Sequence, residues 1–209
     1  RRNYLAALRD AVGIVLQKNL LFSGTIRDNL RWGDPNADDE TLWAACRAAC
    51  ADEFLERMPD GLDTDMGQGG VNVSGGQKQR VSLAGVMVDQ VKILMFDEPL
   101  ASLDPATGKQ AIELIDEIQH KTDTTVLIIE HRLEDVLWRN VDRIILVNEG
   151  TILADLRPDE LLSGSLLAEN GIREPLYLTA MRYAGIAITP EKRPAHVDTV
   201  VLDDADTAR

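Results

Sequence analysis

The stretch VKILMFDEP, residues 91–99, decides the fold. Five of its first six residues are apolar, which is typical of a short strand buried on both faces of a parallel sheet. The run stops at Asp97 and Glu98, and Pro99 lacks the amide that a strand in a sheet interior needs. The sequence therefore predicts a buried strand over 91–96 that ends in two carboxylates.

Two other stretches share this pattern. VGIVL, residues 12–16, is followed by Gln17, and TTVLII, residues 124–129, is followed by Glu130 and His131. In an open parallel sheet, ligands bind beyond the carboxyl ends of the strands, so these polar groups should converge with the first strand's carboxylates. One strand alone could simply end in a polar surface residue. Three strands that end in Gln, Asp-Glu and His indicate a set suited to magnesium, water and phosphate.

The two adjacent carboxylates should have different roles, because successive side chains on a strand point to opposite faces. One of Asp97 and Glu98 can hold Mg²⁺ directly or through its waters, and the other can orient an attacking water. His131 could donate a hydrogen bond to a terminal phosphate. A lone histidine is more often structural, but its place at a strand end beside the carboxylates favours a functional role.

The stretch VSGGQKQRVSLAG, residues 73–85, is the second informative one. Ser74 is a typical helix cap, and Gly75 and Gly76 would let the backbone amides of the helix start approach an anion closely. A single Ser-Gly-Gly before a helix is weak evidence, since it could be only a cap after a turn. Followed by QKQR and then by ILMFDEP, it indicates a phosphate contact.

Other elements follow from periodicity and turn residues. Apolar residues at three- and four-residue steps predict one helix over about 39–58, capped by Asp38 or Asp39. Asp104 and Pro105 predict a helix start. We expect that helix to bury Ala111, Leu114, Ile115 and Ile118. Further expectations are a loop over 59–73, a helix from Ser74 to about Val88, a short helix after His131, a hairpin turning at 148–150, two helices over 158–171 and 174–185, and a loose end after Pro190.

Composition limits the class of protein. The 209 residues are 44% hydrophobic and 27% charged, as in a globular α/β domain with a small appendage. The net charge is −13, and the acidic second part of the chain argues against nucleic acid as a ligand. No apolar run approaches the roughly 20 residues of a membrane span, so we expect a soluble protein. Cys46 and Cys50 should be small buried side chains of a reduced protein rather than zinc ligands, because the histidines are remote.

Five segments resemble, in order, the motifs of ABC-type ATPases. They are VLQ (15–17) for the Q-loop, VSGGQKQR (73–80) for the signature, ILMFDEP (93–99) for Walker B, ASLDP (101–105) for the D-loop and IIEH (128–131) for the switch histidine. The resemblance implies a partial P-loop NTPase fold with parallel core strands, a helical signature subdomain and a small C-terminal extension. The implied parts are a core strand with the Q-loop start (1–17), the helical subdomain (18–90), the RecA-like core (91–155) and a helical extension with a loose tail (156–209).

The resemblance also implies a role for each matching residue, with ATP and Mg²⁺ as cofactors. It assigns Gln17 to the metal and the attacking water, Asp97 to Mg²⁺, Glu98 to the catalytic base and His131 to the terminal phosphate. It assigns the signature residues Ser74, Gly75, Gly76 and Gln77 to contacts with the terminal phosphate of the nucleotide. Ser102 and Asp104 would lie at the interface between two ATPase subunits.

The family's phosphate loop, G-x-x-x-x-G-K-[ST], occurs nowhere in the 209 residues. The only Gly-Lys pair lies in TGKQ, residues 107–110, where Gln stands in the place of Ser or Thr and Leu103 in the place of the earlier Gly. A strand, the loop and its helix with a return strand need roughly 30 residues before Gln17, so we expect the chain to begin after the loop. Family members form head-to-tail dimers in which each signature helix closes over the partner's loop. The chain should therefore complete a partner's site, and the isolated chain should hydrolyse ATP negligibly.

The resemblance differs along the chain. Residues 1–80, which include LFSGTIRDNL, resemble the ATPase domain of ABC exporters, where that segment faces the membrane domain. Residues 74–190 resemble the ATPase subunits of energy-coupling-factor importers. The isoleucine content changes at the same place, with 2 in residues 1–80 and 12 in 81–209. We therefore predict a junction within SGGQKQR, made by recombination or by an assembly artefact.

The expected function is that of the ATP-binding subunit of an ABC transporter, at the cytoplasmic face of a membrane. Its expected partners are a second ABC ATPase subunit, identical or different, and a transmembrane subunit, but no nucleic acid. One alternative is a non-hydrolytic subunit that only donates its signature. Another is a chromosome-maintenance type of ABC ATPase lobe. That type requires a long heptad segment and a basic surface, and the sequence shows neither.

Overall fold

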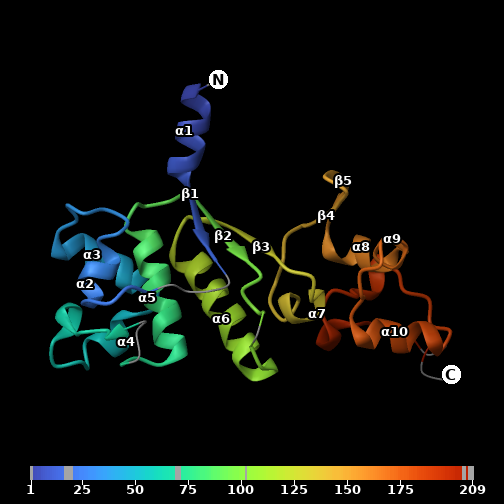
Figure 1. The fold of residues 1–209 in the computed structure, drawn as a ribbon. Coiled ribbons are helices and arrows are strands. Elements are labelled where there is room, and N and C mark those ends of the chain that lie inside the picture. The colour runs from blue at the N-terminus through green and yellow to red at the C-terminus, as the bar shows by residue number, and fades with distance from the viewer. Residues whose placement is uncertain (1, 17–20, 69–71, 102, 204–205, 207–209) are drawn as a thin grey trace. The chain divides into compact units, whose positions relative to one another are not determined.

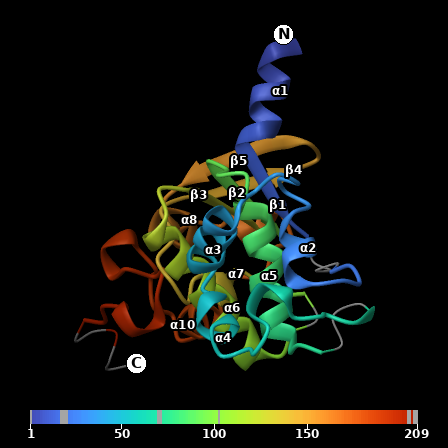
Figure 2. The same cartoon turned by 90° about the vertical axis from the view of Figure 1, so that its left-hand side faces the viewer.

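The structure is a computed structural model that describes residues 2–16, 21–68, 72–101, 103–203 and 206. Two of the predicted site residues, Gln17 and Ser102, lie outside the described residues. The chain divides into two compact units, residues 1–129 and 130–209, called unit 1 and unit 2 below. The elements of each unit can be followed in Figure 1 and, from a second direction, in Figure 2.

Unit 1 is built on a three-stranded sheet in the order β1–β2–β3. The strands are β1 (Val12–Val15), β2 (Ile93–Asp97) and β3 (Thr125–Ile129). Both pairs are parallel, and the register places Phe96 of β2 beside Val15 and Ile128. The predicted α/β class and the three predicted parallel strands are confirmed.

Helices cover this sheet and form the helical part of unit 1. They are α1 (Arg2–Ala11), α2 (Ile26–Leu30), α3 (Asp39–Ala48), α4 (Asp52–Leu55), the 3₁₀ turn η1 (Gly61–Asp63), α5 (Gly75–Met87) and α6 (Pro105–Lys121). α5 packs against β1, α2 and α3, and α6 packs against β3. The three predicted caps are confirmed, since the side chains of Asp38, Ser74 and Asp104 each accept a backbone amide of the following helix.

The prediction of one helix over 39–58 is wrong, because the chain turns at Cys50. Cys50 has φ +53, and its amide donates to the Arg47 carbonyl while the Ala51 amide donates to the Cys46 carbonyl at 2.8 Å. These two bonds make a Schellman motif, in which the left-handed position is usually glycine. Arg80 of α5 donates to the Cys50 carbonyl at 2.6 Å and ties the turn to the signature helix.

Both cysteines are buried and free, as predicted. Burial raises the pKa of the Cys46 thiol to about 12 and also raises the pKa of the Cys50 thiol. Both thiols are therefore neutral at ordinary pH. Cys46 acts as a small apolar group, and Cys50 Sγ accepts a hydrogen bond from Lys121 Nζ at 3.2 Å.

The expectation that all three strands are buried on both faces is wrong. Leu94 and Phe96 are fully buried on the face that α5 and α6 cover. The side chains of the other face are open, with exposed fractions of 50% for Ile14, 38% for Leu127 and 51% for Ile129. We call this the open face of the sheet.

A close approach between β1 and α5 explains why glycine stands at position 13. A Cβ added to Gly13 would lie 2.3 Å from Val86 Cγ1 and 3.1 Å from Val91 Cγ2. Valine in a helix has one strongly preferred rotamer, so Val86 yields only at a cost. Gly13→Ala is therefore expected to lower the free energy of unfolding of unit 1 by about 1–3 kcal/mol in urea denaturation.

The double variant Gly13→Ala/Val86→Ala is the control for this prediction, because it removes the clashing methyl group. We expect it to be less destabilised than the sum of its two single variants, by at least ~1 kcal/mol of coupling. Additive losses would show that the clash at Val86 does not limit position 13.

Unit 2 combines a hairpin with short helices. The elements are α7 (Leu133–Val136), β4 (Ile144–Asn148), β5 (Thr151–Leu156), α8 (Pro158–Ser163), α9 (Leu166–Glu169), α10 (Leu176–Tyr183) and the 3₁₀ turns η3 (Pro190–Lys192) and η4 (Val197–Thr199). β4 and β5 are antiparallel and turn at Glu149 and Gly150, both with positive φ. This confirms the predicted hairpin, the short helix after His131 and a helix within 174–185. The prediction of one helix over 158–171 is wrong, because α8 ends at Ser163, with Gly164 as its C-cap, and α9 begins at Leu166.

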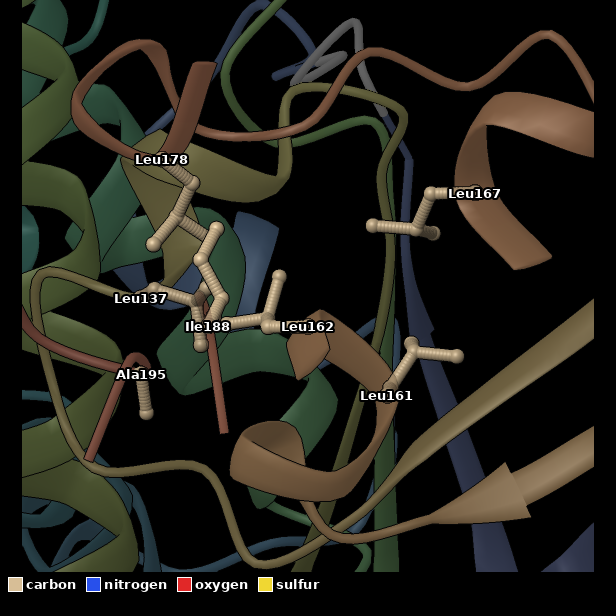
Figure 3. Close-up of a cluster of buried hydrophobic side chains, with 7 residues drawn as sticks. All are labelled: Leu137, Leu161, Leu162, Leu167, Leu178, Ile188 and Ala195. Atoms are coloured by element: carbon tan, nitrogen blue, oxygen red, sulfur yellow. The ribbon is translucent and has the colours of Figure 1, made fainter. Parts of the chain in front are cut away.

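Seven buried side chains form the core of unit 2, as Figure 3 shows. They are Leu137, Leu161, Leu162, Leu167, Leu178, Ile188 and Ala195. Ala195 belongs to the segment after Pro190, so the prediction of a loose end is wrong for this part. His196 Nδ1 lies 2.7 Å from the Leu137 carbonyl oxygen, and the Ala195 amide donates to the Asp159 carboxylate at 2.8 Å. These contacts join residues that are 36 and 59 positions apart in the sequence, and they hold the segment after Pro190 in place.

Tyr177 should make the stability of unit 2 depend on pH above 10. Its hydroxyl donates to the Pro194 carbonyl, and burial, with Glu134 and Asp159 nearby, raises its pKa from 10.0 to about 12. Because the folded pKa is the higher one, the contribution is complete below pH 10 and is lost as the pH rises to about 12. We expect a loss on the order of 1–2 kcal/mol, measured by hydrogen exchange of unit 2.

Tyr177→Phe should remove most of this pH dependence and cost about 1–2 kcal/mol at pH 9, because the buried carbonyl loses its donor. The control is Tyr183→Phe, since Tyr183 is 89% exposed. Equal loss of stability between pH 10 and 12 in the wild type and Tyr177→Phe would contradict the assignment.

Candidate functional site

β2 places Asp97 at the carboxyl end of the sheet. Asp97 lies beside Ile129 in the register of the parallel pair, and both residues lie on the open face. Phe96 points to the covered face, because side chains alternate along a strand. A half-buried carboxylate at this edge can coordinate a cation from a ligand that lies beyond the strand ends.

Glu98 follows in an unusual backbone conformation. Its φ of +47 lies in the left-handed region, which costs a non-glycine residue about 1–2 kcal/mol. The Glu98 amide donates to the Ile129 carbonyl at 2.9 Å, and the Glu98 carbonyl accepts the Ala101 amide at 3.1 Å. A strained backbone conformation that hydrogen bonds hold on both sides is typical of functional positions. It fixes the direction in which the Glu98 side chain extends from the end of β2.

His131 is the second residue of unit 2 and lies two residues after the end of β3. The preceding Glu130 carboxylate is only 2% exposed, and its Oε1 accepts the amides of His131 at 2.9 Å and Arg132 at 3.1 Å. Oε1 also lies 3.2 Å from His131 Nδ1. The burial of the Glu130 carboxylate was not predicted from the sequence. The position of Glu130 directly after a predicted strand had indicated only a polar residue at the edge of the sheet.

The signature residues form the exposed start of α5. Ser74 and Gln77 make a reciprocal capping box: the Ser74 amide donates to Gln77 Oε1 at 2.9 Å, and the Gln77 amide donates to Ser74 Oγ at 3.3 Å. Within the described part of the chain, the amides of Gly75 and Gly76 donate to no acceptor. A Cβ at either glycine would meet no atom within 4 Å. Two amides at an open helix start are suited to bind an anion.

α5 and β2 run in opposite directions, as Figure 1 shows. The amino end of α5, with Ser74 to Gln77, therefore lies on the same side of unit 1 as the carboxyl end of β2, with Asp97 and Glu98.

Asp104 caps α6, the helix after the D-loop motif. Its carboxylate accepts the amides of Ala106 at 3.0 Å and Thr107 at 3.1 Å and the Thr107 hydroxyl. These bonds, led by the Thr107 hydroxyl, lower its pKa. The side chain is exposed and therefore available to a second subunit, but this interface role stays a prediction.

An exposed aromatic pair lies near β1 and was not predicted as a separate feature. The rings of Phe22 and Trp32 stack with centroids 4.4 Å apart, and Trp32 is 67% exposed. The side chain of buried Asn29 fixes the backbone of Phe22, because it accepts the Phe22 amide at 2.8 Å and donates to the Phe22 carbonyl at 3.0 Å. The pair borders a cavity of about 390 Å³. The available signal was Phe22 within LFSGTIRDNL, residues 21–30, and Trp32 two residues after it.

The described residues contain no group of three or more His, Cys, Asp or Glu side chains placed to hold a metal ion. None of the helices among them is both long and apolar enough to cross a membrane.

Comparison with known proteins agrees with these features. Residues 2–101 match the ABC transporter family model, and residues 164–209 match a model described as ATP-binding cassette cobalt transporter. The first match runs through SGGQKQR, where we predicted a junction. A match across this stretch does not test the junction, which stays a prediction.

The chain is similar to relatives that are named as candidate ABC transporter ATP-binding proteins. One from Photobacterium profundum is 61% identical over 132 residues, which cover 63% of this chain and 23% of the relative. One from Vibrio vulnificus is 54% identical over 159 residues, which cover 76% of this chain and 26% of the relative. The chain thus spans about a quarter of the length of these relatives.

A solved structure shows the same fold. A bacterial Atm1-family ABC exporter with ATP bound matches with a TM-score of 0.60 and 32% identity, over 85% of this chain and 29% of the exporter chain. This match agrees with the parallel sheet and helices described above. Residues 2–101 therefore match the ATP-binding domain of ABC transporters, and the fold of the chain is similar to that of an ABC exporter.

Proposed function

We propose that this chain supplies the signature and Walker B parts of an ABC transporter subunit that couples ATP binding and hydrolysis to transport. The observation that carries the proposal is the open space around Gly75 and Gly76. Neither residue has a positive φ, and a Cβ at either would meet nothing within 4 Å, so the fold itself does not require glycine there. Glycine in a helix costs up to about 1 kcal/mol relative to alanine. A phosphate that approaches the helix amides closely would explain why glycine stands at both positions despite this cost.

The residues at the end of β2 fit a magnesium nucleotide. Mg²⁺ is usually held by one or two carboxylates together with substrate phosphates, which suits Asp97 and does not require a cluster within the chain. Bound Mg²⁺ would neutralise charge on the phosphates. Glu98 would accept a proton from the attacking water, His131 would contact the terminal phosphate, and Gln17 would contact the metal and the water.

We further propose that the site is shared between two subunits. The 209 residues contain no G-x-x-x-x-G-K-[ST] motif, so Ser74 to Gln77 would close over the phosphate loop of a second ABC ATPase subunit. Ser102 and Asp104 would contact that subunit. A polypeptide of these 209 residues alone would hydrolyse ATP negligibly, and it would act as the signature donor in the pair.

A mixing experiment tests this proposal. The partner is an ABC ATPase domain that carries the phosphate loop and whose own signature serine is replaced by arginine, which disables signature donation between partner copies. Addition of this chain should raise ATP turnover of the mixture in a saturable way. ATP turnover by this chain alone, or no rise at saturating chain concentration, would contradict the shared site.

The transmembrane partner is proposed to contact the Phe22–Trp32 pair. Exposed stacked aromatics beside a cavity are suited to receive an apolar segment of another protein. The exporter-like segment LFSGTIRDNL lies in the same region, and in the resembling family it faces the membrane domain. The subunit would then lie at the cytoplasmic face of the membrane.

A further inference from the structure

Cys50 stands at a position where the backbone alone would favour glycine. Its φ of +53 lies in the left-handed region, which a residue with a side chain adopts at a cost. The turn between α3 and α4 therefore does not explain why a cysteine stands there. Cys50 is only 2% exposed, so its side chain acts through contacts inside unit 1.

The side chain of Cys50 contacts α6, 71 positions later in the sequence. Lys121, the last residue of α6, donates from Nζ to Cys50 Sγ at 3.2 Å. The same ammonium group lies 2.8 Å from Glu117 Oε1, one turn earlier in α6. Glu117 and the Cys50 sulfur raise the pKa of Lys121, so the donor is charged at ordinary pH. A charged donor strengthens a hydrogen bond, and the Glu117 contact directs the ammonium group.

The backbone of Cys50 contacts the signature helix. Its carbonyl accepts Arg80 Nη1 at 2.6 Å, and the same nitrogen lies 3.6 Å from Glu53 Oε2 in α4. Less than two turns of α5 separate Arg80 from Ser74, so a shift of the helix at Arg80 also moves the amides at its start. Cys50 thus joins two helices of unit 1, α6 through its sulfur and α5 through its carbonyl.

The helices joined in this way pack mainly against different elements. α6 packs against β3, whereas α3 packs against α4 and α5. Packed groups of helices move relative to one another by small rotations and by sliding, and a few contacts between the groups can limit such motion. The hydrogen bond from Lys121 to Cys50 is a contact of this kind, because it connects the end of α6 to the turn after α3.

We propose that Cys50 and Lys121 are positioning residues, whose hydrogen bond holds α3, α4 and α5 at a fixed angle to α6 and thereby aims the signature amides. This inference rests on the proposed role of the chain as a signature donor. Neither residue would touch the nucleotide, and both would act through α5. A displacement of about 1 Å at a reacting group can lower a rate about 10²-fold, so a small rotation of α5 would be sufficient.

Stimulation of the partner ATPase tests the proposal. Cys50→Ala removes the acceptor, and Lys121→Met removes the charged donor but keeps a long apolar side chain. Each should lower the maximal stimulated turnover about tenfold. The double variant should lose no more than either single variant, because the same hydrogen bond is removed in all three. Cys50→Ser keeps an acceptor and should retain the turnover, which a loss of thiol packing alone would not explain.

Lys92→Met is the matched control, because Lys92 is an exposed lysine elsewhere in unit 1 and the substitution removes the same charge. It should stimulate the partner as the wild type does. The Lys121 side chain is 47% exposed, so Lys121→Met should keep the wild-type circular dichroism spectrum and remain informative if Cys50→Ala does not fold.

A distance measurement tests the same contact without a partner. Spin labels on ketone-bearing residues that replace Lys78 of α5 and Gln110 of α6 leave the native thiols unchanged. Pulsed electron paramagnetic resonance should give a narrow distance distribution for the wild type and for Cys50→Ser. It should give a broader one for Cys50→Ala and Lys121→Met.

The outcomes separate this proposal from the shared site. Equal distance distributions in the wild type and Lys121→Met would overturn it, as would a loss in the double variant equal to the product of the two single losses, or a tenfold loss in Lys92→Met. A wild-type chain that does not stimulate the partner would contradict the shared site, and the distance distributions would then decide whether Cys50 and Lys121 hold α5.

Discussion

Replacement of both Gly75 and Gly76 by alanine is expected to stabilise unit 1 and to remove the ability of the chain to stimulate a partner ATPase. The added methyl groups meet no atom of the chain within 4 Å, and alanine favours the helix, so the free energy of unfolding should rise by about 0.5–1 kcal/mol. The same methyl groups would stand between the helix amides and a phosphate. We expect stimulated ATP turnover to fall about 10²-fold, as when a preorganised donor is lost.

Urea denaturation and ATP turnover of the mixed subunits measure the two effects on one protein sample. The matched control is Gly108→Ala in the interior of α6, where a Cβ would lie 3.8 Å from Leu100 Cδ2 in ordinary contact. This variant should also gain stability, but without loss of turnover. If the Gly75/Gly76 variant retained full stimulation, close phosphate approach would not explain the two glycines.

The features that were predicted correctly from the sequence are those with a local cause. Asp38, Ser74 and Asp104 cap helices through their own side chains, within three residues of the amides they bind. The strands that end before Glu98 and Glu130 are short apolar runs, and such runs have few alternatives to a strand in a parallel sheet. Such signals need no knowledge of the rest of the fold.

The features that were missed depend on contacts between distant residues or on unusual backbone conformations. The helix break at Cys50 uses a left-handed position without the glycine that usually marks it. The left-handed conformation of Glu98 likewise has no residue signal. The segment after Pro190 is ordered by His196, which contacts a carbonyl 59 positions earlier in the chain.

The open face of the sheet was missed for another reason. An apolar run such as TVLII is the same whether one face or both faces of the strand are covered, so sequence cannot distinguish the two cases. Register and neighbouring helices decide it, and in unit 1 they cover only the face of Leu94 and Phe96. Asp97 shares the other face, where a ligand can reach it.

Phe96→Ala is expected to destabilise unit 1 more than Gly13→Ala does. Phe96 is 1% exposed, lies in the central strand and has Val15 and Ile128 beside it in the register. Removal of its ring should cost about 3–5 kcal/mol, a large part of the roughly 5–15 kcal/mol that usually stabilises a whole domain. Asp97 and Glu98 follow directly, so stimulation of a partner by this chain should be lost together with the fold of unit 1.

Ile14→Ala is the matched control, because Ile14 lies in the neighbouring strand on the open face and is 50% exposed. Hydrogen exchange of unit 1 should show a loss below about 1 kcal/mol for this variant, and exchange of unit 2 should be unchanged in both variants. A loss at Ile14 as large as that at Phe96 would mean that the open face is covered in solution. Asp97 would then be closed to a ligand from that side, and the proposed magnesium contact would have to be abandoned for this form of the chain.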